Sequence, residues 1–136
     1  MAKMNLPSLE CKIEMFSSIN PSEDPSKVES SILNIFPYCK INIEKFSVKG
    51  DSNDLHSLEK IHQAIHSRKS QRIYRRTMEK NLENNSTWFY LNKQAAFAEK
   101  IAICGESDES PLGPIKIVLT SNDIEEIIDW LILEKG

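Results

Sequence analysis

The spacing of apolar residues switches between period two and period 3.6 along this chain, and these switches constrain its fold class more than any other feature. Residues 9–18 alternate apolar and polar side chains, which is typical of a strand with one buried face. Apolar residues then recur at helical spacing from Val28 to Phe36. Asp24 followed by Pro25 resembles a helix N-cap and first helical position, and Pro37 should end the helix. These segments predict a strand followed by a helix.

The rest of the chain continues the same alternation. We predict further strands over residues 39–48, 87–91, 98–104 and 115–119, and a final helix that begins near Ser121. Asp54 should cap a helix, and a second helical pattern contains Tyr74 and Met78; the spacing does not decide whether residues 67–70 separate the two. The prediction is an α+β fold in the order β-α-β-α-α-β-β-β-α, with a mixed sheet of about five strands and helices packed on it. We expect one domain spanning 1–136, with an ordered core of about 9–133.

Composition excludes several classes of protein. No apolar run reaches the roughly 18 residues of a membrane span, and residues 1–18 do not resemble an export signal, so we expect a cytoplasmic protein without a membrane partner. The cysteines, Cys11, Cys39 and Cys104, are widely separated, which favours buried apolar residues over disulfides or zinc ligands. With four glycines there is no phosphate-binding loop, and no catalytic constellation is present. We therefore predict no catalytic activity and no cofactor.

Two further clusters, a pair of histidines and an acidic loop, do not predict a metal site. His62 and His66 lie four residues apart, but no glutamate base or third ligand accompanies them, so we predict no metal site. The acidic loop at residues 106–109 lacks the pattern of a calcium loop, and a solvated turn is favoured.

Charge is strongly segregated along the chain. Of 136 residues, 17 are Lys or Arg and 20 are Asp or Glu, which gives a net charge of −3. Residues 60–80 hold seven cations and one acid, so this stretch carries +6 and the remainder carries −9. All four arginines lie between Arg68 and Arg76. The mild overall acidity therefore does not exclude a nucleic-acid partner.

The basic stretch supplies the first candidate site. Residues spaced four apart form one row on a helix, about 6 Å between neighbours. Arginine can bind phosphate through its planar fork. The candidates are the row Arg68, Arg72, Arg76 and Lys80, flanked by Lys69 and Arg75. The alternative is that this basic helix faces acidic surface of the same chain, of a second copy or of another protein.

The aromatic stretch from Trp88 to Leu91 supplies the second candidate site. If one face of this strand is open, its aromatic rings could stack on unpaired bases, although aromatics in a central strand are more often core on both sides. Asn92, Lys93 and Gln94 follow at the strand end and could supply hydrogen bonds to RNA.

Several motifs resemble an uncharacterised archaeal protein family described as RNA-binding. They are residues 89–97 (FYLNKQAAF), 110–115 (SPLGPI), 21–25, 34–37 and 128–131. The resemblance extends from about residue 9 to residue 133. It implies a fold similar to the large-subunit ribosomal protein that binds five-S RNA, with helices on one face of the sheet. The chain departs from the family pattern at Glu99, where many members have glycine, and at Arg75, where an acidic residue is common.

The sequence as a whole favours a non-catalytic RNA-binding protein that contacts structured or single-stranded RNA through its basic helix. The second hypothesis is a structural or interaction protein whose basic helix mediates a homodimer or another protein contact.

Overall fold

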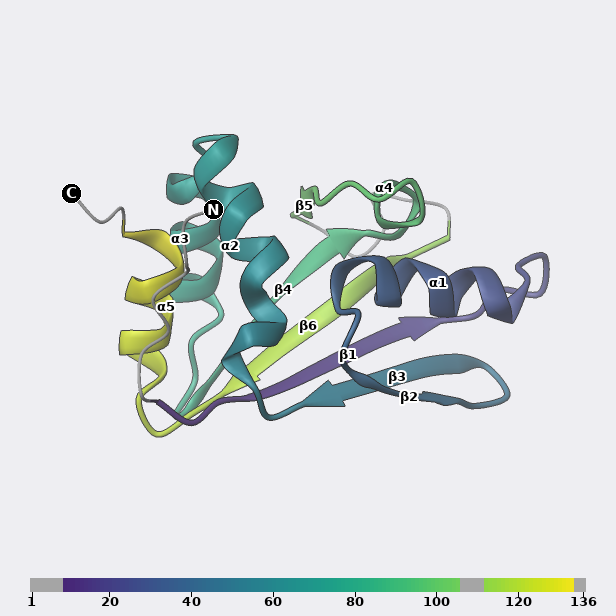
Figure 1. Cartoon of the computed structure of the whole chain (residues 1–136), viewed down its shortest axis with the longest axis horizontal. Helices are drawn as coiled ribbons and strands as arrows, with labels where there is room; N and C mark the ends of the chain where they lie inside the picture. The colour runs from purple at the N-terminus through teal and green to yellow at the C-terminus, as the bar shows by residue number, and fades with distance from the viewer. Residues whose placement is uncertain (1–8, 106–111, 134–136) are drawn as a thin grey trace.

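The computed structural model describes residues 9–105 and 112–133. The strands are β1 (Lys12–Ser18), β2 (Lys40–Ile43), β3 (Ser47–Ser52), β4 (Ser86–Asn92), β5 (Ile103–Cys104) and β6 (Pro114–Thr120). The helices are α1 (Pro25–Ile35), α2 (Glu59–Ser67), α3 (Gln71–Lys80), α4 (Lys93–Phe97) and α5 (Ile124–Ile132), and a 3-10 turn, η1 (Leu55–Leu58), precedes α2. The strands form a six-stranded sheet in the order β2-β3-β1-β6-β4-β5 (Figure 1). The predicted α+β fold class is confirmed.

The helix ends follow from local chemistry. Asp24 caps α1 by accepting the Ser26 N–H at 3.0 Å, and Pro25 occupies the first helical position. Asp54 caps η1 in the same way by accepting the His56 N–H at 2.9 Å. The α1 helix ends at Ile35, two residues before Pro37, as the sequence predicts.

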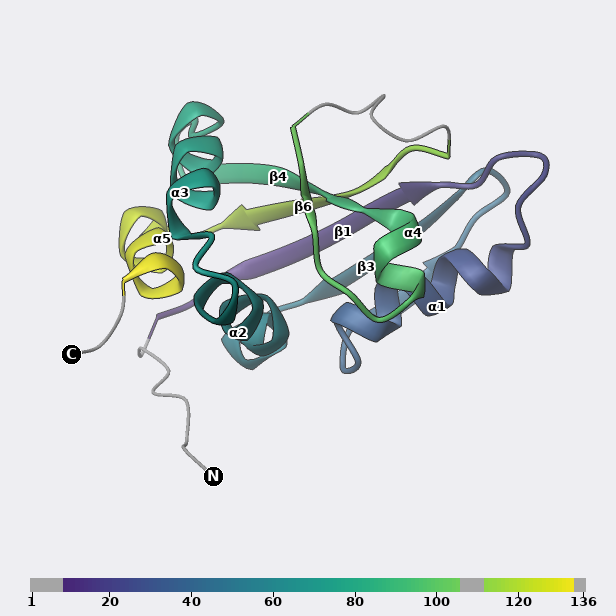
Figure 2. The same ribbon diagram turned by 90° about the horizontal axis from the view of Figure 1, so that it is seen from above.

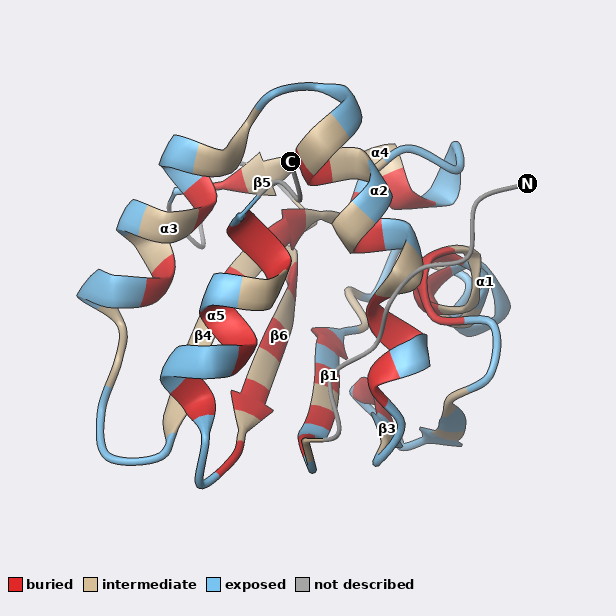
Figure 3. Cartoon of the chain, turned by 60° about the vertical axis from the view of Figure 1, so that its left-hand side comes forward, coloured by how far each residue is buried: buried red, intermediate tan, exposed pale blue. Residues whose placement is uncertain are grey.

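The helices cover one face of the sheet, and the hydrophobic core lies between the two layers (Figures 1 and 2). Alternate strand residues point into this core and are fully buried, among them Ile13 and Met15 on β1, Phe89 on β4 and Ile117 on β6. The residues between them on β1, β4 and β6 are half-buried or exposed, which gives these strands their banded pattern in Figure 3. We call this second side of the sheet the open face.

The strand predictions need three corrections. The single strand predicted over 39–48 is wrong, because the chain reverses between Glu44 and Ser47 and forms the β2–β3 hairpin; the Glu44 N–H donates to the Ser47 carbonyl at 2.8 Å. Neighbouring strands are antiparallel instead of mixed. The strand predicted over 98–104 shrinks to the two residues of β5, because the short helix α4 and its turn take up the chain before it.

Two helices end in a left-handed residue that is not glycine. At the end of α2, Lys69 has φ 52°, and the Ser70 N–H reaches back to the Ile65 carbonyl at 2.9 Å. At the end of α4, Glu99 has φ 63°, and the Lys100 N–H reaches the Ala95 carbonyl at 2.8 Å. Both are Schellman caps, a position that favours glycine. Residues 68–70 therefore separate α2 from α3.

The likeness to the ribosomal protein that binds five-S RNA stays a prediction. The acidic loop assigned to a solvated turn, residues 106–109, lies outside the described residues.

Candidate nucleic-acid interface

The outer side of α3 is a row of cations. Arg72, Arg76 and Lys80 are exposed, and none of the three side chains has a hydrogen-bond or ion-pair partner within the described part of the chain. The opposite side of the helix buries Tyr74 and Met78 against the core. Because like charges four residues apart destabilise a helix by a few tenths of a kcal/mol per pair, this row is best suited to a polyanionic partner.

Arg75 has a different role from its neighbours. Its guanidinium donates to Glu79 Oε2 at 3.2 Å and to Asp129 Oδ1 of α5 at 3.0 Å. It therefore links α3 to α5 and neutralises one carboxylate on each helix, Glu79 and Asp129. Such half-exposed ion pairs contribute at most about 1 kcal/mol each to stability.

The predicted four-residue row is interrupted at its first member. Arg68 caps the end of α2, and Lys69 occupies the left-handed position, so both precede α3 instead of continuing it. Both side chains are exposed at the α2–α3 junction. The structure therefore offers a three-residue row, Arg72, Arg76 and Lys80, with two further cations near its first turn. We call these five cations the basic face.

Two hydrogen bonds fix α3 to the aromatic strand. The buried Thr87 hydroxyl donates to the Met78 carbonyl at 2.6 Å. Asn81, which caps the C-terminus of α3, donates through Nδ2 to the Trp88 carbonyl at 2.9 Å. Among the described residues, β5 pairs with Tyr90 and Leu91 of β4 and leaves the earlier residues of that edge without a neighbouring strand. The hydrogen bond from Asn81 satisfies the Trp88 carbonyl on this uncovered part of the edge. The basic face and β4 are thus rigidly connected.

The polar triplet after β4 is mostly structural. Lys93 is 2% exposed, and its ammonium donates to the carbonyls of Ser18 and Leu112, both at 2.8 Å, and to Glu23 at 3.0 Å. The Asn92 side chain accepts the Ala95 N–H at 2.8 Å and thereby caps α4. Gln94 is the exposed member. A buried ammonium with three acceptors cannot reach a phosphate, so Lys93 has no part in our proposed interface.

The open face carries aromatic side chains, so the interpretation of the β4 aromatics as core on both sides is wrong. Phe89 and Leu91 are buried, but Trp88 and Tyr90 are half-exposed on the opposite side, with ring centroids 5.0 Å apart. Phe16 of β1 lies on the same face and is 42% exposed. Sequence reasoning missed Phe16, although its position out of phase with Ile13 and Met15 was a usable signal.

Lysines lie among these rings. Lys116 of β6 pairs with Phe16 on one side and with Tyr90 on the other, and its Nζ lies 4.7 Å from the centroid of Trp88. Lys49 of β3 lies 5.9 Å from the centroid of Phe16. The acids of this face lie toward β3 and the start of β1, where Glu14 is 3.8 Å from Lys12.

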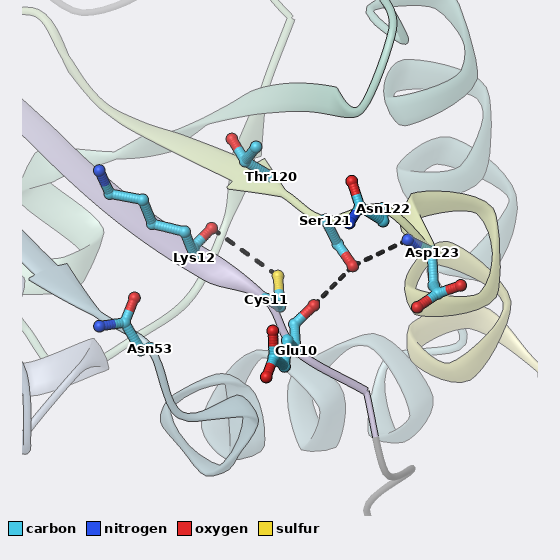
Figure 4. Close-up of a pocket in the computed structure, with 8 residues that line it drawn as sticks. All are labelled: Glu10, Cys11, Lys12, Asn53, Thr120, Ser121, Asn122 and Asp123. Carbon is cyan, nitrogen blue, oxygen red and sulfur yellow. Dashed lines mark hydrogen bonds between the residues drawn. The ribbon is translucent and has the colours of Figure 1, made fainter.

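A shallow pocket lies at the end of the sheet where β1 begins and β6 ends (Figure 4). Within it the Ser121 hydroxyl donates to the Glu10 carbonyl at 2.5 Å and accepts the Asp123 N–H at 3.0 Å, which joins the chain before β1 to the start of α5. Burial raises the pKa of Cys11 to about 11, so this thiol is neutral at pH 7 and is not an activated nucleophile. The pocket therefore holds a structural junction, in which Glu10 and Asp123 satisfy the Ser121 hydroxyl.

No helix among the described residues is long and apolar enough to cross a membrane. No group of three or more His, Cys, Asp or Glu side chains among them is placed to hold a metal ion.

Comparison with known proteins adds the family. A family model described as "RNA binding" matches residues 12–121. A UPF0201 protein of Methanothermobacter thermautotrophicus is 38% identical over 120 residues, covering 88% of this chain and 89% of that protein. This chain belongs to the UPF0201 family. A UPF0201 protein of Sulfurisphaera tokodaii is 37% identical over 124 residues, covering 88% and 86% of the two chains.

The UPF0201 fold has also been seen by crystallography. The crystal structure of a UPF0201 protein from Methanococcus jannaschii superposes with a TM-score of 0.78 at 28% identity, covering 92% of this chain and 95% of that one. The predicted membership of an archaeal protein family described as RNA-binding is confirmed. The left-handed φ of Glu99 gives a physical reason for the glycine that our sequence reading expects there in other members.

Proposed function

We propose that this protein binds RNA and contacts its phosphates through the basic face of α3. The observation that carries the proposal is the set of cations without carboxylate partners among the described residues: Arg68, Lys69, Arg72, Arg76 and Lys80. Membership of a family whose model is described as RNA binding supports the same reading. Gln94 lies outside this face and is a secondary candidate contact.

The residue types and the spacing of the row suit a phosphate backbone. Arginine forks bind phosphate oxygens through two parallel hydrogen bonds, and a row spaced by about 6 Å can contact several phosphates of one strand. The alternative is that the helix faces acidic surface of its own chain. Among the described residues of α3, only Arg75 forms such ion pairs, with Glu79 and Asp129. The remaining cations are still available.

The test compares two double variants that each remove two positive charges. Arg72→Ala with Arg76→Ala changes the basic face, whereas Lys40→Ala with Lys45→Ala changes exposed lysines of the β2–β3 hairpin at the opposite end of the strand order. RNA affinity is measured over a range of salt concentrations. The arginine variant should lower the slope of log affinity against log salt by about 1.4, because each contacted phosphate of a single strand contributes about 0.7.

The lysine variant should leave that slope nearly unchanged. Equal effects of the two variants would show that binding is diffuse and would refute the assignment to α3. Loss of an oligomer in the arginine variant on a sizing column, with RNA binding unchanged, would favour the protein-contact alternative instead.

A further inference from the structure

We propose that the open face of the sheet is a stacking platform for unpaired bases of a single-stranded RNA segment. Its rings are Phe16, Trp88 and Tyr90, and its cations are Lys49 and Lys116. This inference rests on the proposed function and names the kind of RNA that the site accepts. It goes beyond the basic face, which contacts phosphates and cannot by itself distinguish a duplex from a single strand.

The first support is that these large rings are not buried: Phe16 is exposed, and Trp88 and Tyr90 are partly exposed. The alternate residues of the same strands, such as Phe89 and Ile117, are 0% exposed in the core. The three rings of the open face would be buried in the same way only if a second layer covered them. Within the described residues, no helix lies on that face (Figures 1 and 2). Exposed aromatic surface on a sheet is costly in water, and base stacking would bury it.

The second support is the order of side chains across the sheet. The register places Phe16 opposite Lys116 and Lys116 opposite Tyr90, so ring, ammonium and ring follow one another on three adjacent strands. Neighbouring strands are about 4.8 Å apart, so this row spans roughly 10 Å. Trp88 extends the row along β4, with its ring centroid 5.0 Å from that of Tyr90. Alternating rings and cations can hold bases and phosphates of one strand together.

The third support is energetic. Lys116 lies over the Trp88 ring, a partly exposed cation–π contact worth about 1 kcal/mol. Stacking of a base on an aromatic ring is worth about 1–3 kcal/mol. A base can therefore displace the ammonium from the ring, and the released ammonium can then pair with a phosphate of the same strand.

The fourth support is continuity with the basic face. Asn81 at the end of α3 donates to the Trp88 carbonyl, so the basic helix and the ring-bearing strand meet at the edge of β4. A single strand whose phosphates lie along α3 can cross this edge onto Trp88 and Tyr90. Glu14 and Asp51 lie in the neighbouring cross-strand row, which continues through Val118 to Trp88; they occupy its β1–β3 end, where they would repel phosphates. The charges therefore direct the strand along the Phe16 row.

The test uses the intrinsic fluorescence of Trp88. The other tryptophan, Trp130, lies on the helix side, stacked on His62 with centroids 4.9 Å apart, and Trp130→Phe leaves Trp88 as the sole reporter. The probes are an oligouridylate and a blunt-ended RNA duplex of the same strand length. The oligouridylate should quench the emission of Trp88 at saturation, and the duplex should leave it nearly unchanged.

A variant series measures the same contact as affinity in the full chain. Trp88→Leu and Tyr90→Leu should each weaken oligouridylate binding about fivefold to hundredfold, with the salt slope unchanged, because they remove stacking and no charge. Tyr38→Leu is the matched control, since Tyr38 is an exposed ring that contacts His56 on η1, away from the open face. Circular dichroism confirms that each variant is folded, and the quenching experiment needs no change in the sheet.

The outcomes separate this inference from the function on which it rests. If the arginine variant of α3 weakens binding but Trp88 is neither quenched nor needed, phosphate binding stands and the platform is wrong. If the duplex binds at ~50 mM salt and the oligouridylate does not, phosphate binding stands and the platform is wrong; if neither RNA binds, both are wrong. If Trp88→Leu abolishes self-association without changing RNA affinity, the open face is a protein interface and the platform is again refuted.

Discussion

Replacing Lys93 by methionine should destabilise the fold far more than it weakens RNA binding. The ammonium is buried and has three oxygen acceptors, two of them backbone carbonyls and one the carboxylate of Glu23. Methionine fills a similar volume but donates no hydrogen bond. The substitution therefore removes the ammonium from Glu23 and from both carbonyls. Asn20 still donates to Glu23 and to the Leu112 carbonyl, but the Glu23 carboxylate loses its countercharge in a region from which water is largely excluded.

The expected loss can be estimated from that geometry. Removing one partner of a buried ion pair costs about 3–5 kcal/mol, whereas total stability of a typical domain is about 5–15 kcal/mol. For a chain of 136 residues this loss corresponds to a fall in Tm of roughly 10–17 °C. The matched control is Lys100→Met, because Lys100 is exposed; its effect should stay within about 0.5 kcal/mol.

The loss of stability caused by Lys93→Met should also depend on pH. Burial raises the pKa of Glu23, but hydrogen bonds from Asn20 and Lys93 and the charge of Lys93 outweigh it, so the pKa lies below the ordinary value of 4.5. A depressed pKa contributes stability that is present above pH 4.5 and is lost as pH falls through the folded-state pKa. Lys93→Met removes part of this contribution. The stability difference between the two proteins should therefore narrow as pH falls below about 4.5.

Urea denaturation, monitored by circular dichroism at neutral pH and at several acidic pH values, measures the loss of stability and its dependence on pH. RNA affinity is then measured for the folded variant at low temperature, where it should match that of the unaltered protein. A loss below about 1 kcal/mol, or weakened RNA binding at full stability, would refute the structural role assigned to Lys93.

Three further substitutions test other parts of the account by urea denaturation. Thr87→Val should cost about 1–3 kcal/mol, because it leaves the Met78 carbonyl without the hydroxyl that fixes α3 to β4; a neutral result would contradict that link. Asp24→Ala should cost about 1 kcal/mol by removing the cap of α1, and Asp24→Ser should restore most of it. Glu99→Gly should stabilise the protein by a few tenths to about 1 kcal/mol by relieving its left-handed backbone, and a loss of stability would contradict the assigned cap.

Much of the fold followed from the periodicity of apolar residues. The alternation of Ile13 and Met15 with polar neighbours and the helical spacing from Val28 both correspond to observed elements. These signals are strong because burial of one face dictates them directly. The hairpin between β2 and β3 escaped prediction because its turn, Glu44 to Ser47, contains no Gly, Pro or Asn.

The missed helix boundaries share one cause. Lys69 and Glu99 occupy left-handed caps in which glycine is the usual signal, so nothing in their residue types indicated that a helix ends there. The hydrogen bonds that close these caps are local backbone bonds, Ser70 to Ile65 and Lys100 to Ala95, which any residue type can make. The sequence alone could therefore not place the break between α2 and α3.

The sequence predicts the positive charge of the candidate site but not which of its cations form ion pairs. The cluster of arginines is visible in the sequence, and the structure leaves Arg72 and Arg76 exposed. Whether Arg75 or Lys93 is available depends on carboxylates that are 54 and 70 positions away in the chain, Asp129 and Glu23. Pairing over such separations is decided by tertiary packing, which local sequence patterns do not indicate.

The most direct test of the central claim is the RNA affinity of the unaltered full chain as a function of salt. With at least three cations of α3 on phosphates of a single strand, log affinity should fall by about 2 or more for each log unit of salt. Measurable binding at ~50 mM salt with that slope is the predicted result. Absence of binding at that salt, or an affinity that does not change with salt, would contradict the account.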